Sequence, residues 1–104
     1  MIVMSRYKFV AIKLQNNTYN ALVNDLDEVV EAKTMKALKR EVARILIKFM
    51  LENGQRLPKR GEIDIRALYK ERTHSEISEE EFRNAKIEEV KLELHDNNIT
   101  LYVD

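Results

Sequence analysis

The sequence has no cysteine, no tryptophan, one proline and two glycines among its 104 residues. Without cysteine, the chain has neither a disulfide framework nor a thiolate metal site. So little proline and glycine argues against a many-turned all-β fold. No apolar run reaches the roughly 20 residues of a membrane-spanning helix, and Arg6 and Lys8 make the N-terminus too charged for a signal peptide. We therefore expect a cytoplasmic protein that does not enter a membrane.

Net charge is also absent, because 18 Lys and Arg balance 18 Asp and Glu. The two signs are nevertheless segregated along the chain. Residues 32–72 hold 12 basic and 5 acidic side chains, net +7, whereas residues 73–104 hold 3 basic and 9 acidic side chains, net −6. Two interpretations stay open: the acidic part folds back over the basic part, or the basic part is a functional surface.

The strongest periodic pattern runs from Thr34 to Asn53 and predicts an amphipathic helix, because its apolar residues recur at steps of three and four. Thr34 is a suitable N-cap, and Gly54 is suited to the position that follows the helix. The apolar stripe comprises Met35, Leu38, Val42, Ile45 and Phe49, widened by Leu46 and Met50. We expect Leu38, Val42, Ile45 and Phe49 to be core.

Alternating hydrophobicity before the helix predicts three strands, at Tyr7–Leu14, Thr18–Val23 and Glu28–Ala32. A hairpin register that pairs Leu14 with Tyr19 brings the apolar residues of the first two strands to one side. Those residues are Val10, Ile12 and Leu14 on the first strand and Tyr19, Ala21 and Val23 on the second.

After the long helix, the sequence predicts two short helices and a second hairpin. Asp64 can cap a helix through Arg72, and Ser78 with Glu81 forms a capping box for the next helix. Two alternating stretches, Val90–Leu94 and Ile99–Val103, then flank a turn at residues 95–98. The predicted fold is a single α+β domain over residues 1–104. Its β-β-β-α core spans residues 1–60, and an α-α-β-β extension spans residues 61–104.

Residues 7–60 carry a family resemblance: a hairpin, the Asp25-Leu26 bend, a Thr34-capped helix and an exit through Asn53-Gly54-Gln55-Arg56-Leu57-Pro58-Lys59. In order and spacing this region resembles the HicB family of toxin–antitoxin antitoxins. The resemblance implies a partial ribonuclease-H-like β-β-β-α sheet that binds and neutralises a small RNA-cleaving toxin. Residues 62–104 do not follow the helix-turn-helix or ribbon-helix-helix module that usually ends that family.

The residues that could carry chemistry do not form a recognisable catalytic pattern. His74 and His95 are the only histidines and lack metal-binding spacing, no serine lies in a nucleophile motif, and no glycine-rich phosphate loop is present. The acids Asp25, Asp27 and Glu28 either cap a tight bend or belong to a residual two-metal nuclease site. We favour the first interpretation, and predict a non-enzymatic protein without cofactor or metal.

The candidate partner-binding surface is the helix face opposite the apolar stripe. It comprises Lys36, Arg40, Arg44, Ile47, Lys48 and Leu51. The two aliphatic residues among these cations must be covered, either by the C-terminal extension of the chain or by another chain, including a second copy in a homodimer. The basic residues suit an acidic protein and also suit phosphates.

Three functional hypotheses follow. The first is an antitoxin-type module that binds a small toxin or effector nuclease. The second is a stand-alone inhibitor from a phage or another mobile element that blocks a host defence nuclease, as anti-CRISPR proteins do. The third is a nucleic-acid-binding or residual nuclease domain. We predict the first, and the other two stay open as alternatives.

Overall fold

The computed structural model describes residues 3–54, 56–58, 64–94 and 99–102. Its elements are β1 (Val3–Lys13), β2 (Tyr19–Val23), the 3-10 turn η1 (Asn24–Leu26), β3 (Glu28–Ala32), α1 (Met35–Glu52), α2 (Ile65–Thr73), α3 (Glu79–Arg83), β4 (Lys86–Leu94) and β5 (Ile99–Tyr102). The predicted α+β class is confirmed, and the elements follow in the predicted order. The predicted turn at residues 95–98 and the end of the last strand at Val103 lie outside the described residues.

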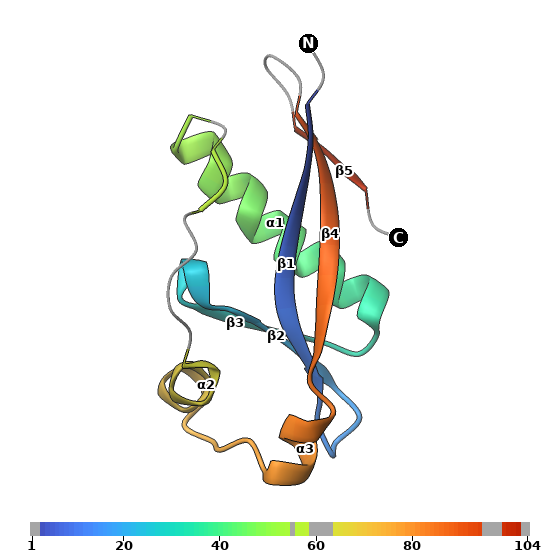
Figure 1. Cartoon of the computed structure of the whole chain (residues 1–104), viewed down its shortest axis with the longest axis vertical. Coiled ribbons are helices and arrows are strands. Elements are labelled where there is room, and N and C mark those ends of the chain that lie inside the picture. Colours follow the sequence, from blue (N-terminus) through green and yellow to red (C-terminus); the bar gives the residue numbers. More distant parts are fainter. Residues whose placement is uncertain (1–2, 55, 59–63, 95–98, 103–104) are drawn as a thin grey trace.

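The five strands form one antiparallel sheet in the order β3-β2-β1-β4-β5, and α1 crosses one of its faces (Figure 1). β4 pairs with β1 from Val3↔Leu94 to Ala11↔Lys86. The C-terminal hairpin therefore completes the sheet beside the central strand β1. Because successive side chains of a strand point to opposite faces, β1 contributes to the packing on both sides of the sheet.

α1 begins and ends where its sequence predicts. The Thr34 Oγ1 accepts a hydrogen bond from the Ala37 N–H at 3.1 Å, and Gly54 has a φ of +68° just after the C-cap residue Asn53. The buried residues of the helix follow a line of four-residue steps, namely Leu38, Val42, Leu46 and Met50, with Ala43 beside it.

The predicted core position of Ile45 and Phe49 is wrong in part. Both are only partly buried and pack at the margin of the principal hydrophobic cluster. Compared with the predicted orientation, the helix is rotated about its axis, so that the side with Leu46 and Met50 faces the sheet. The sequence predicts these two residues at the edge of the apolar stripe.

The predicted register of the first hairpin is wrong by one residue. Lys13 pairs with Tyr19 and Ala11 with Ala21. The connecting loop is a turn closed by a hydrogen bond from the Asn17 N–H to the Leu14 oxygen, and Asn17 has a φ of 66°. A residue in this left-handed conformation after a tight turn shortens the loop to three residues and so shifts the pairing.

Because successive side chains of a strand point to opposite faces, the two sets of apolar β1 residues lie on opposite faces of the sheet. Tyr7, Phe9 and Ala11 belong to the principal cluster under α1, whereas Ile12 packs with Leu22 and Tyr69 of α2 in a second cluster. Val10 and Leu14 join the second cluster as partly buried residues. The expectation that Val10, Ile12 and Leu14 lie on the same side as Tyr19, Ala21 and Val23 is therefore wrong, because the shifted register puts the first set against α2 and the second set under α1.

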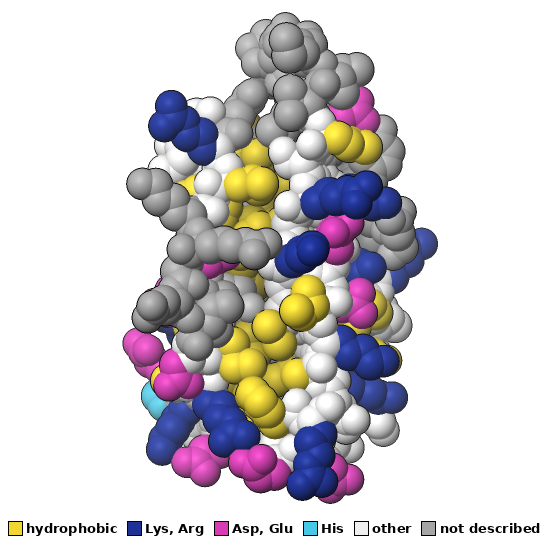
Figure 2. All heavy atoms as spheres, viewed as in Figure 1, with side chains coloured by type: hydrophobic (Ala, Val, Ile, Leu, Met, Phe, Trp, Pro, Cys, Tyr) yellow, Lys and Arg dark blue, Asp and Glu magenta, His cyan; other side chains and the backbone are white. Residues whose placement is uncertain are grey.

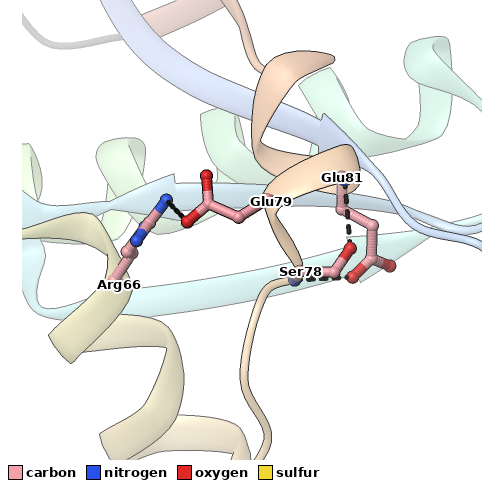
Figure 3. Close-up of polar contacts among 4 residues, drawn as sticks. All are labelled: Arg66, Ser78, Glu79 and Glu81. Carbon is pink, nitrogen blue, oxygen red and sulfur yellow. Dashed lines mark hydrogen bonds and ion pairs between the residues drawn. The ribbon is translucent and has the colours of Figure 1, made fainter.

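Both short helices are capped as predicted. Asp64 accepts a hydrogen bond from the Ala67 N–H at 3.1 Å. In the capping box of α3, the Ser78 N–H donates to Glu81 Oε1 at 3.0 Å and the Glu81 N–H donates to Ser78 Oγ at 3.1 Å (Figure 3). The Glu81 carboxylate also accepts from the Gln15 N–H at 3.0 Å, which ties α3 to the first hairpin loop. The hydrogen bond from the Ser78 backbone, and after it in size the one from the Gln15 backbone, holds the pKa of Glu81 below its ordinary value.

This lowered pKa predicts a pH-dependent contribution to stability. A carboxyl group with a lower pKa in the folded state stabilises the protein above its unfolded pKa, and the contribution is lost as pH falls through the folded pKa. Glu81→Gln keeps an acceptor in the capping box but removes the charge. The variant should unfold at lower urea than wild type at neutral pH, and the difference should shrink in acid. Glu80→Gln, an exposed neighbour on α3, is the control and should show no shrinking difference. A Glu81→Gln difference that persists unchanged in acid contradicts this account.

Asn20 of β2 is a buried polar residue, 3% exposed, and its Nδ2 has no hydrogen-bond partner among the described residues. A buried donor without a partner costs about 1–3 kcal/mol. Asn20→Leu, whose side chain branches at the same carbon, should therefore raise the free energy of unfolding by about 1 kcal/mol in urea titrations. Asn20→Asp, the polar control, should lower it. A lower value for the leucine variant would show that the amide is hydrogen-bonded in solution.

Candidate protein-binding surface

The outer face of α1 carries a row of cations at four-residue steps: Lys36, Arg40, Arg44 and Lys48. All four are exposed. Each lies two residues from a member of the buried line, which on a helix is close to the opposite side. The row extends over about 18 Å along the helix axis. We call this row, together with Leu51, the basic face of α1.

The two aliphatic residues predicted to lie within this face behave differently. Leu51 is 63% exposed, next to Lys48 at the C-terminal end of the row. Ile47, by contrast, is partly buried and packs against the principal cluster. Its predicted place on the outer surface is therefore wrong in part, because the rotation of the helix brings Ile47 toward the sheet.

The described C-terminal strands do not cover the basic face. β4 and β5 lie within the sheet, on which α1 packs through its inner side. Leu51 remains exposed among the described residues. Of the two ways to cover this face that the sequence leaves open, cover by the C-terminal hairpin is excluded for the described strands.

Ion pairs distinguish the cations of α2 from those of α1. Each basic residue of α2 reaches a carboxylate: Arg66 bonds Glu79 at 2.8 Å (Figure 3), Lys70 bonds Glu76 at 3.0 Å and Arg72 bonds Asp27 at 2.6 Å. The part of the chain that the structure describes offers no ion-pair partner to Lys36, Arg40 or Lys48, and Arg44 reaches only Glu41 of its own helix, at 3.5 Å. The acidic residues thus neutralise α2 and leave the basic face of α1 charged.

The side of α1 toward β4 follows a different pattern. Lys39, whose side chain is only 13% exposed, lies 3.6 Å from Glu88. This pair belongs to the packing of the helix on the sheet. Lys39 is therefore not part of the basic face. The charge count along the sequence does not distinguish it from the other cations of α1.

The acids of the bend before β3 have structural partners. The Tyr7 hydroxyl donates a hydrogen bond to Asp25 at 2.6 Å. Asp27, which has a φ of 56°, forms an ion pair with the guanidinium of Arg72. Among the described residues, no group of three or more potential ligand side chains is placed to hold a metal ion. His74 is exposed and ends α2 in the left-handed conformation. His95 lies outside the described residues.

Two surface features of the structure are not predicted by the sequence. A pocket of about 640 Å³ lies at the end of the sheet near the start of α1, and its charged lining is of both signs: Lys13, Lys86, Glu80, Glu81 and Glu88. On the face of the sheet opposite α1, Ile87 is 72% exposed beside its β1 partner Val10. Both features are formed by segments that are distant in the sequence, so no local sequence pattern predicts them.

The chain matches no protein-family model, no curated protein and no solved structure. The resemblance of residues 7–60 to the HicB antitoxins therefore stays a prediction. No helix in the described ranges is long and apolar enough to cross a membrane. The structure defines the class: an α+β domain whose sheet is covered by helices on both faces and whose longest helix turns a charged side outward.

The phase of α1 can be tested with two identical substitutions on one helix. Leu46 is fully buried and Leu51 is 63% exposed. Leu46→Ala should lower the free energy of unfolding by about 2–5 kcal/mol, because it leaves a cavity. Leu51→Ala, the control, should change it by no more than about 0.5 kcal/mol. Equal losses in urea unfolding would mean that the exposed side of α1 is covered in solution.

Proposed function

We propose that the protein is a non-enzymatic, antitoxin-like binding module that neutralises a small toxin or effector in the cytoplasm. It binds this partner directly, through the basic face of α1. The observation that carries the proposal is the selective pairing of charges: the cations of α2 have carboxylate partners, and Lys36, Arg40 and Lys48 have none among the described residues. A row of like charges on one helix favours an acidic partner surface.

Leu51 favours a protein partner over a nucleic acid. Protein interfaces combine apolar anchors with charges at the rim, and Leu51 is an exposed aliphatic residue at the end of the cationic row. Binding of single-stranded nucleic acid usually adds aromatic side chains on which bases stack. The only aromatic residue of α1, Phe49, packs against the principal cluster instead.

The sign of the charge also restricts how the partner docks. The substrate groove of an RNA-cleaving toxin is expected to be basic, because it holds phosphates. The basic face of α1 would meet like charges there, which is unfavourable. We therefore expect α1 to dock on an acidic surface of the effector, beside its substrate groove.

The test isolates the effector and then measures its affinity for matched variants. The tagged protein is expressed in its native host, and a bound effector is identified, purified and titrated with wild type, Arg40→Glu and Arg83→Glu. Both arginines are exposed helix residues, but Arg83 lies on α3. Arg40→Glu should weaken binding at least about tenfold and Arg83→Glu should not, because only Arg40 belongs to the basic face. Leu51→Glu should also weaken binding while the protein stays folded by circular dichroism.

Wild-type protein should moreover inhibit the toxicity or nuclease activity of the purified effector, and Arg40→Glu should inhibit it less. Equal affinity of Arg40→Glu and Arg83→Glu contradicts the proposed surface. Capture that disappears after nuclease treatment indicates nucleic-acid binding instead of protein binding.

A further inference from the structure

β1 is much longer than its neighbour β2. It pairs with β4 over Val3–Ala11, but with β2 only over Val10–Lys13. η1 follows β2 and ends the pairing. The β2-side edge of β1 from Val3 to Phe9 therefore has no strand beside it among the described residues. Figure 1 shows β1 and β4 running on together beyond β2 and β3.

The hairpin geometry identifies which backbone groups face this open edge. The Leu14 N–H donates to the Thr18 oxygen, so Leu14 turns its backbone groups toward β2. In an antiparallel strand the direction alternates from one residue to the next. The N–H and C=O groups of Met4, Arg6 and Lys8 consequently point to the open edge, whereas those of Ser5 and Tyr7 point to β4. An edge with such groups can accept another strand.

The side chains along the edge differ between the two faces of the sheet. On the face opposite α1, Arg6 is exposed, with 66% of its side chain accessible, and its Nε lies 3.7 Å from Glu89 of β4. Lys8 is exposed beside it. On the face of α1, Tyr7 and Phe9 are buried in the principal cluster. Figure 2 shows hydrophobic side chains in a hollow beside the part of β1 that extends beyond β2. A strand added here would place one set of its side chains over apolar surface and the other set beside cations.

We propose that this edge of β1 binds an extended acidic segment of a partner protein, which adds as a sixth strand in which apolar and acidic residues alternate. Charge complementarity determines the occupant, because opposite charges on neighbouring strands attract and like charges repel. A second copy of this chain would bring its own Arg6 and Lys8 to the same side, so it is the less favoured occupant. The proposal rests on the proposed function and adds the mode of recognition, but it uses a surface other than the basic face of α1.

The first test is amide hydrogen exchange by NMR on the free protein. The Ser5 and Tyr7 amides should be protected by β4, and the Arg6 and Lys8 amides should exchange much faster. Adding a peptide of about seven residues that alternates valine and glutamate should slow exchange at Arg6 and Lys8 at least about tenfold. A valine–lysine peptide of the same length is the control and should have no effect.

Variants of β1 make the test independent of peptide chemistry. Met4→Pro removes an N–H that faces the open edge, so the fold should survive and peptide protection should be lost. Ser5→Pro removes an N–H that faces β4 and should destabilise the fold. The double variant Arg6→Glu with Lys8→Glu should reverse the preference between the two peptides. Arg40→Glu should leave peptide binding unchanged, so a failure of the α1 surface is distinguishable from a failure of this edge.

Three results would overturn the proposal. Protection of Arg6 and Lys8 equal to that of Ser5 and Tyr7 in dilute free protein would mean that the chain covers its own edge. Protection that rises with protein concentration would mean that a second copy binds there. Exchange that neither peptide slows would mean that the edge does not accept a strand of this chemistry.

Discussion

The pairing of β1 with β4 is the interaction on which the rest of the structure depends. It joins the two ends of the chain over nine residue pairs, from Val3↔Leu94 to Ala11↔Lys86, and makes β1 the central strand. Phe9 and Ala11 of β1 belong to the cluster under α1, and Val10 and Ile12 belong to the cluster under α2, so this part of β1 is apolar on both faces. Val90 and Leu92 of β4 lie in the same cluster as Tyr7 and Phe9 of β1. The two strands together form the apolar surface on which α1 packs.

This arrangement determines which surfaces remain available. α1 uses one side to bury the principal cluster, so its opposite side, with four cations and Leu51, faces outward. α2 covers the other face of the sheet and binds its own cations to carboxylates from the bend and from the residues around α3. β1 extends beyond β2, and this leaves an unpaired edge of β1 beside the basic residues Arg6 and Lys8. Two exposed surfaces thus carry cations, and we propose an acidic partner for both.

Local signals in the sequence predicted the helix ends, because Thr34, Asp64 and Ser78 cap helices through residues only three positions away. The register of the first hairpin was not predictable in the same way. It depends on the left-handed conformation of Asn17, and the hydrophobic pattern of β1 permits either face to be the inner one. The cations of the basic face were predicted, but the inward turn of Ile47 and the open edge of β1 were not. They follow from the rotation of a helix and from the unequal lengths of strands that pair across the chain.

The claim that the basic face of α1 meets the partner is tested most directly by methyl NMR of leucine-labelled protein with its purified effector. Leu51 reports on the basic face, and Leu46, on the same helix, reports on the core. The account predicts that the Leu51 methyl signals shift on binding and lose their exposure to a soluble paramagnetic probe, while those of Leu46 do not change. Leu51 signals that stay unchanged and exposed in the saturated complex would contradict it.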